Sequence, residues 1–227
     1  MGAGKRKLSG RSTYPFRTRT RHMRGPLRAG IAIYNAGEHH AAHDAWEEVW
    51  LDTDRESDDA RLLQGLIQFT AAIYHARNRN WEGATGLAES ALSYLDGLGE
   101  RYRGVDLGPV REALTALASD PERIERTVPP TLTHDGEALS LSDLDFEESA
   151  ITAVVLAEER DGYDVTTIER AVEYAERDLE SGYETSPFVT LVLDFAREPD
   201  RRAIVHDRLS QHVSRRLARE EDVSGLF

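Results

Sequence analysis

The sequence predicts an all-α fold, a five-helix bundle followed by a helical C-terminal region. Apolar residues recur every three or four positions along most of the 227 residues, which is the period of an amphipathic helix. Capping residues stand at the ends of these stretches, and the two-residue alternation typical of strands is not evident. Hydrophobic residues make up 40% of the chain, enough to form a core. No apolar run approaches the roughly 20 residues needed to span a bilayer, and no signal-peptide pattern appears.

Five helices are expected in the N-terminal half. Gly37 ends the first, because glycine readily adopts the left-handed conformation that follows many helices. Ser57 begins the third and Asn80 the fourth, since both side chains can accept a hydrogen bond from the first helical turn. The five helices are expected over residues 27–36, 38–51, 57–78, 80–95 and 109–118, with a short turn over 121–126.

Four more helices are expected in the C-terminal half, after a break rich in proline and small polar residues. Thr166 with Glu169 has the pattern of a capping box, and Pro187 suits the first position of a helix. The four helices are expected to begin at Ser142 or Asp145, at Thr166, at Ser186 and at Asp200. The predicted organisation is a basic segment 1–24, a helical bundle 25–126, a linker or long loop 127–143 and a helical region 144–227.

Charge is distributed unevenly along the chain. Residues 1–24 hold eight of the 28 bases and no acid, so the remainder holds 20 bases against 41 acids, a formal charge of −21. Lys5 and Lys7 are the only lysines. An acidic body without lysine is typical of halophilic proteins, because dense carboxylates retain hydration where salt screens charge strongly. A GC-rich genome would explain the arginines but not the excess of acid. The Glu147–Glu148 and Glu158–Glu159 pairs are expected on solvated surface.

The basic N-terminal segment has two interpretations. It could be a disordered arm that binds nucleic acid. It could also be a non-native extension, since Met23 lies just before the first helical pattern. We favour the extension, because high salt would weaken a simple phosphate-binding arm.

Several classes of chemistry have no support in the sequence. The chain has no cysteine, which excludes disulfides, thiolate catalysis and cysteine-ligated zinc. It also lacks a phosphate-binding loop, a nucleophile elbow and a dinucleotide fingerprint.

The second expected helix carries the first half of a candidate polar site. His39, His43 and Glu47 follow one another at a spacing of four residues, so they share one helical face, and His43 lies beside Trp50. The spacing suits a half-buried histidine satisfied by its carboxylate, with Glu47 orienting the His43 ring. It also suits a small-molecule or catalytic site, or a metal site. All three interpretations remain open on spacing alone.

The third expected helix carries the second half. Gln64, Gln68 and His75 fall on one line of its surface, and two of the three glutamines in the protein are here. An uncharged stripe that both donates and accepts hydrogen bonds suits a neighbouring helix or a ligand. The short connection between the second and third helices predicts an antiparallel hairpin, which would bring this stripe toward His43 and Glu47.

Three stretches together resemble the domain of unknown function 309 family. They are residues 43–50 (HDAWEEVW), 63–68 (LQGLIQ) and 74–77 (YHAR), which are similar to that family's H-[ED]-x-x-E-x-x-W signature and Q-G-x-[IL]-Q helix. The similarity covers roughly residues 27–98, and residues 145–227 look like the extensions of haloarchaeal members. The resemblance implies a helical bundle without an assigned activity. By motif position it implies functional roles for His43, Asp44, Glu47, Trp50, Gln64, Gln68 and, less directly, His75.

We therefore expect a cytoplasmic helical protein with a small-molecule-binding or hydrolytic site. The expected catalytic residues are His43, Glu47 and His75, and the expected ligand-binding residues are Asp44, Trp50, Gln64 and Gln68. No cofactor and no tightly held metal ion are expected. The expected partner is a small molecule or a protein, including a second copy of the chain, and neither membrane nor nucleic acid. The alternative is a non-catalytic interaction module in which the same residues specify helix packing.

Overall fold

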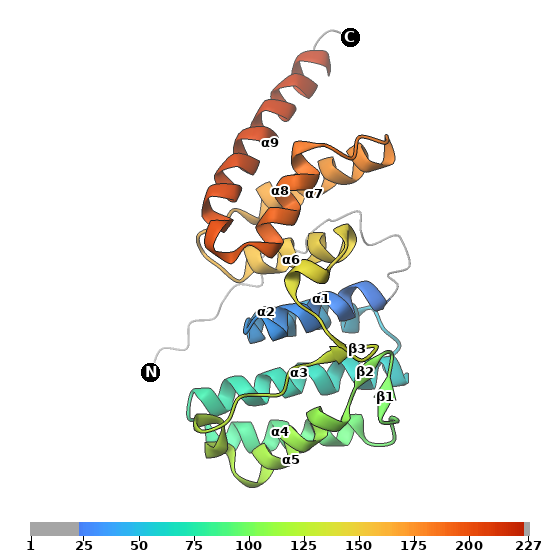
Figure 1. Ribbon diagram of the computed structural model, residues 1–227, viewed down its shortest axis with the longest axis vertical. Helices are drawn as coiled ribbons and strands as arrows, with labels where there is room; N and C mark the ends of the chain where they lie inside the picture. Colours follow the sequence, from blue (N-terminus) through green and yellow to red (C-terminus); the bar gives the residue numbers. More distant parts are fainter. Residues whose placement is uncertain (1–22, 225–227) are drawn as a thin grey trace.

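The computed structural model describes residues 23–224. Residues 1–22, which make up most of the predicted basic segment, lie outside the described range. Helices dominate the described part of the chain (Figure 1). They are α1 (Arg24–Asn35), α2 (His39–Leu51), α3 (Asp58–Arg77), α4 (Trp81–Leu95), α5 (Gly108–Ser119), α6 (Phe146–Glu158), α7 (Val165–Glu180), α8 (Pro187–Arg197) and α9 (Arg202–Ser224). Short 3-10 helices span Pro121–Glu125, Leu141–Asp143 and Pro199–Arg201.

The predicted caps of the N-terminal half are present. Gly37 has a φ of +88°, as expected after the end of α1. The side chain of Ser57 accepts a hydrogen bond from the backbone of Ala60, and Asn80 accepts one from Gly83. These contacts satisfy amide groups that would otherwise lack partners in the first turns of α3 and α4.

The start of α7 differs from the prediction. Its cap is Asp164, whose side chain accepts from the backbone N–H of Thr167, so the proposed capping box at Thr166 is wrong. Asp164 and Thr166 both have a side-chain oxygen that could cap a helix. Asp164 is the residue just before α7, and its backbone oxygen also accepts a hydrogen bond from the backbone N–H of Ile168. Asp145 caps α6 and Ser186 caps α8, as the sequence predicted.

A small antiparallel sheet was not predicted. Its four two-residue strands are paired in the order β1 (Arg101–Tyr102), β2 (Val105–Asp106), β3 (Thr133–His134) and β4 (Glu137–Ala138). Strands this short give no detectable alternation. The sheet connects the turn before α5 with the segment 127–143. Asn35 at the end of α1 holds that segment, because its amide bonds the backbone of Leu132 and Leu139.

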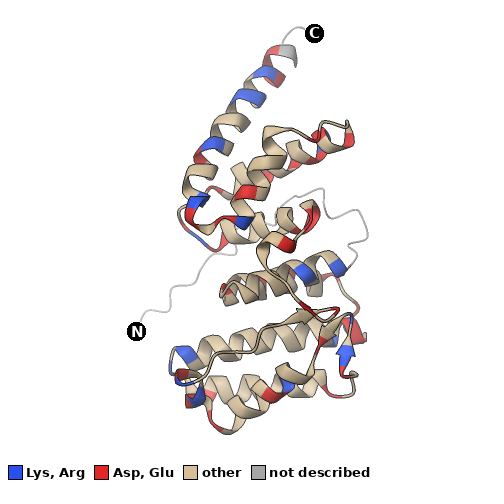
Figure 2. Ribbon diagram, viewed as in Figure 1, with Lys and Arg blue, Asp and Glu red and all other residues tan. Residues whose placement is uncertain are grey.

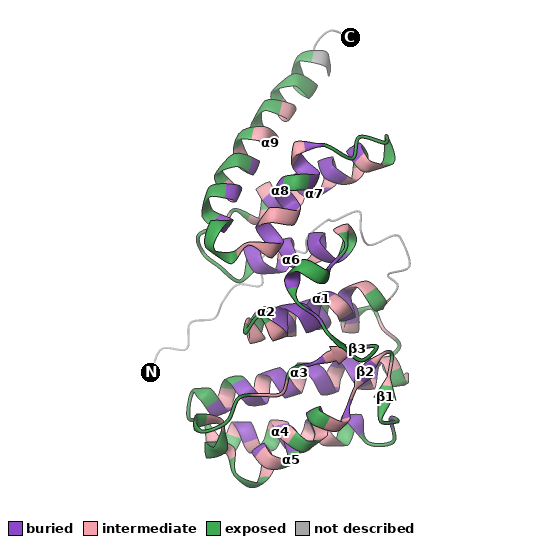
Figure 3. Ribbon diagram, viewed as in Figure 1, coloured by how far each residue is buried: buried purple, intermediate pink, exposed green. Residues whose placement is uncertain are grey.

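The predominantly helical fold agrees with the predicted all-α class, but the helices do not form the predicted five-helix bundle followed by a C-terminal extension. α2 packs on α3, and both α1 and α2 pack on α6, so this pair of helices lies between α3–α5 and α6–α9 (Figure 1). Buried apolar side chains form one continuous cluster that reaches from Leu27 in α1 to Val213 in α9. Figure 3 shows the buried residues on the helix faces that turn toward neighbouring helices. The N-terminal and C-terminal helices therefore share a core.

Charged residues are spread over the exposed helix faces (Figure 2). Acidic positions occur on most helices, whereas basic positions recur along α9. None of the described helices is both long and apolar enough to cross a membrane.

Candidate functional site

The outer face of α2 carries the first part of the site. Trp46 and Val49 turn into the core, which leaves His43, Asp44 and Glu47 half-buried on the other side of the helix. Nδ1 of His43 lies 2.9 Å from Oδ1 of Asp44. The predicted pairing of His43 with Glu47 is thus corrected: Asp44 is the hydrogen-bond partner, and Glu47 is close enough to act through its charge.

The hydrogen bond to Asp44 raises the pKa of His43 above its usual value. Burial lowers this pKa, and the charges of Asp44 and Glu47 raise it. The His43 side chain keeps 27% of its surface exposed, so its ring is held in place and can still be reached from solvent. A positioned imidazole of this kind can take or give a proton.

His40 and Glu159 extend the site and were not predicted. Nδ1 of His40 lies 2.7 Å from Oε2 of Glu159 and 3.4 Å from Oδ2 of Asp44. The His40 and His43 rings are stacked with centroids 6.0 Å apart. Asp44 thus contacts one histidine with each of its oxygens. The spacing of His40 to Asp44, four residues on one helix, was a usable signal, whereas nothing in the sequence places Glu159 beside them.

The end of α6 is held against the start of α2. Arg160 donates to Glu38 at 2.5 Å, and the buried guanidinium of Arg202 lies 3.8 Å from the same carboxylate. This ion-pair group fixes Glu159, which caps the C-terminus of α6, beside His40. The site therefore lies where the N-terminal helices meet the C-terminal ones.

Carboxylates crowd this junction. Burial, together with the negative charges of Glu48, Glu169 and Asp44, raises the pKa of Glu158 from 4.5 to about 7. The expectation of a purely solvated Glu158–Glu159 pair is therefore too simple: both side chains face α2, and Glu159 bonds His40.

Replacing Glu158 with glutamine should stabilise the protein above pH 7. The folded protein keeps the Glu158 proton up to about pH 7, whereas the unfolded chain loses it near 4.5. The wild type therefore loses stability as pH rises through this window, and Glu158→Gln does not. We expect a gain of roughly 1–2 kcal/mol above pH 7, reduced from the fully buried case because more than a third of Glu158 stays exposed to solvent. Urea unfolding in EDTA at several pH values measures this, with the exposed Glu147→Gln as control. A gain that does not vary with pH would contradict it.

The predicted residues on α3 occupy a different environment. α2 and α3 pack as the expected antiparallel hairpin, since His40 near the start of α2 meets Tyr74 near the end of α3 at 6.3 Å between ring centroids. Nδ1 of His75, however, lies 2.6 Å from the side-chain nitrogen of Asn80, the cap of α4. His75 thus belongs to the α3–α4 turn and does not join the His43 group.

Two further predicted residues are Gln64 and Gln68. Both are half-buried, and the amide oxygen of each is buried without a hydrogen-bond partner. Trp50 is half-buried as well, and the guanidinium of Arg55 lies 3.4 Å from its ring centre. His39 turns away from His43, because its Nδ1 lies 2.8 Å from the backbone oxygen of Gly37. Burial lowers the pKa of His39, which favours the neutral ring.

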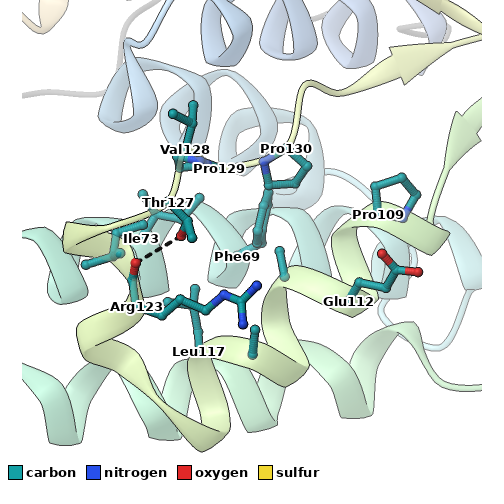
Figure 4. A pocket seen from close by; sticks show the side chains of 13 residues that line it. Phe69, Ile73, Pro109, Glu112, Leu117, Arg123, Thr127, Val128, Pro129 and Pro130 are labelled. Atoms are coloured by element: carbon teal, nitrogen blue, oxygen red, sulfur yellow. Dashed lines mark hydrogen bonds between the residues drawn. The ribbon is translucent and has the colours of Figure 1, made fainter.

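A separate apolar groove of about 240 Å³ lies between α3, α5 and the segment after the first 3-10 helix (Figure 4). Phe69 and Ile73 form its floor, and the Arg123 side chain lies across it. Pro129 and Pro130 form one edge. None of the predicted site residues lines this groove.

These features define a predominantly helical protein with a histidine–carboxylate cluster on α2, at the contact with α6. Residues 27–87 match the sequence profile of the family described as Domain of unknown function (DUF309). An "Uncharacterized protein" of Aquifex aeolicus (strain VF5) is 24% identical over 96 residues, which is 42% of this chain and 28% of that protein. The chain thus spans less than a third of this relative. The matched region contains His40, His43, Asp44 and Glu47, whereas Glu159 lies outside it.

Proposed function

We propose that the outer face of α2 binds a small molecule and hydrolyses it, with His43 as the proton-transferring group. The observation that carries this proposal is the 2.9 Å contact between Nδ1 of His43 and Asp44 on a partly exposed ring. A carboxylate at one nitrogen orients the imidazole and stabilises its protonated form, which leaves the other nitrogen for a substrate or water. Asp44 takes the orienting role that the sequence had suggested for Glu47.

The charge of the site limits the substrate. Three carboxylates lie beside the two histidines, those of Asp44, Glu47 and Glu159. In the protein without added ions they repel phosphate and carboxylate groups, because like charges at short range raise the energy of binding. We therefore expect a neutral or cationic ester or amide as substrate.

Replacing His43 with asparagine should lower hydrolysis of such substrates by roughly 10²–10⁴-fold, the usual contribution of a general acid–base group. The measurement is a panel of neutral and cationic chromogenic esters and amides, assayed in EDTA with wild type and His43→Asn. His212→Asn, which removes a half-exposed histidine on α9, is the matched control and should leave the rates unchanged. Rates that are equal in wild type and His43→Asn for every substrate would reject the proposal.

The alternative is an interaction module in which these polar residues specify helix packing. It is favoured by one observation, the contact of His75 with Asn80 in the α3–α4 turn, because this predicted catalytic residue serves the packing of two helices. Under this alternative, His43→Asn would lower the free energy of unfolding without affecting hydrolysis.

A further inference from the structure

The histidine–carboxylate cluster consists of two overlapping groups of three side chains. One group is His43, Asp44 and Glu47, and the other is His40, Asp44 and Glu159. Within each group the nitrogen and oxygen atoms lie within 4.8 Å of one another. Asp44 belongs to both groups and directs a different oxygen to each, Oδ1 to His43 and Oδ2 to His40.

We propose that these two groups bind a pair of divalent first-row transition-metal ions, with Asp44 bridging them. An ion held at about 2.0–2.2 Å from each ligand keeps any two ligands within roughly 4 Å of each other. The contacts of 2.7–3.4 Å among His40, Asp44 and Glu159 already fall in this range. Small side-chain rotations would bring Glu47 into the same range.

The type of ligand selects the ion. Imidazole nitrogen combined with carboxylate oxygen suits Zn²⁺, Mn²⁺ or Fe²⁺, whereas Ca²⁺ and Mg²⁺ prefer oxygen alone. Four of the five ligands come from α2, where His40, His43, Asp44 and Glu47 occupy positions i, i+3, i+4 and i+7. The fifth, Glu159, is fixed by the ion pairs between α6 and α2. The acidic surroundings favour a cation further.

The sequence had led us to expect no tightly held ion, because it offered at most four ligands, from His39, His43, Glu47 and possibly His75, and only if two helices cooperate. The structure removes His39 and His75 from this set and adds His40, Asp44 and Glu159. Two ions separated by roughly 3.5–4 Å could hold a water molecule and a substrate oxygen together, and they would offset the local negative charge. An anionic substrate would then be accepted. With ions bound, His43 would serve as a metal ligand, so the proton-transfer role proposed for it applies to the protein without metal. The metal site itself does not depend on the proposed hydrolytic function.

Zinc binding to the full chain tests the inference. In molar KCl, which suppresses diffuse binding of counterions, titration calorimetry with Zn²⁺ should give two equivalents for the wild type. Asp44→Asn should bind none, while Glu47→Gln and Glu159→Gln should each bind one. Glu89→Gln, an exposed carboxylate on α4, is the control and should bind two. In NMR spectra, Zn²⁺ should shift the ring signals of His40 and His43 but not those of His134 and His212.

A wild type with fewer than two saturable sites would overturn the inference, as would two sites that survive Asp44→Asn. Circular dichroism of each variant verifies that loss of binding is not loss of folding. If Asp44→Asn does not fold, the two single-site variants and the NMR shifts decide. Zinc binding without hydrolysis rejects the proposed function and leaves the metal site. If hydrolysis in EDTA depends on His43 and zinc does not bind, the proposed function stands and the metal site is rejected.

Discussion

Replacing Trp46 with alanine should lower the free energy of unfolding by about 3–5 kcal/mol, as is usual for a large aromatic side chain removed from a core. Trp46 is completely buried at the centre of the contact between α1 and α2. Its indole Nε1 lies 3.4 Å from the backbone oxygen of Leu27. Gly30 allows this approach, because a Cβ at that position would lie 2.1 Å from the indole nitrogen. Removing the Trp46 ring would therefore leave a cavity at the contact between α1 and α2.

Urea unfolding followed by circular dichroism measures the effect of Trp46→Ala. Trp50→Ala is the matched control on the same helix, and its effect should be clearly smaller, because Trp50 is half-buried and covered by the flexible Arg55. Gly30→Ala should also destabilise the protein, and combining it with Trp46→Ala should cost less than the sum of the two changes. Similar losses for Trp46→Ala and Trp50→Ala would show that the core does not centre on Trp46.

Local features of the fold were predictable from the sequence, whereas the arrangement of its halves was not. The helices and most caps follow from short-range patterns, such as Ser57 before α3 and Ser186 before α8. The sheet could not be predicted, because two-residue strands are stabilised by partners distant in sequence, as in the pairing of Val105 with His134. The position of α1 and α2 between two groups of helices likewise depends on long-range contacts with α6.

The same division holds for the candidate site. His43, Asp44 and Glu47 were predictable because they lie within five residues on one helix. Choosing Asp44 over Glu47 as the partner of His43 depends on side-chain rotamers, which residue spacing does not determine. Glu159 lies more than one hundred residues away from them in the sequence, so only the packing of α6 on α2 brings it to His40.

The contact between α1 and α6 provides the second large effect. Arg28 donates to Glu148 at 2.6 Å, and their side chains are only 14% and 3% exposed. The expectation of a solvated Glu147–Glu148 pair is therefore wrong for Glu148. The other oxygen of Glu148 accepts a hydrogen bond from the backbone of Asp145, which completes the capping box of α6. The Glu148 carboxylate thus neutralises the nearly buried guanidinium of Arg28 and also accepts a hydrogen bond from the backbone N–H of Asp145 at the start of α6.

Replacing Glu148 with alanine should lower the free energy of unfolding by about 3–5 kcal/mol, because it leaves the Arg28 charge buried without a partner and removes half of the capping box. Urea unfolding gives the value, with Glu147→Ala, the exposed neighbour on α6, as a control expected to change it by under about 0.5 kcal/mol. Replacing Arg28 and Glu148 together with Met and Leu should recover part of the loss, since the unpaired charge is then absent. A double variant as unstable as Glu148→Ala would assign the loss to the capping box instead.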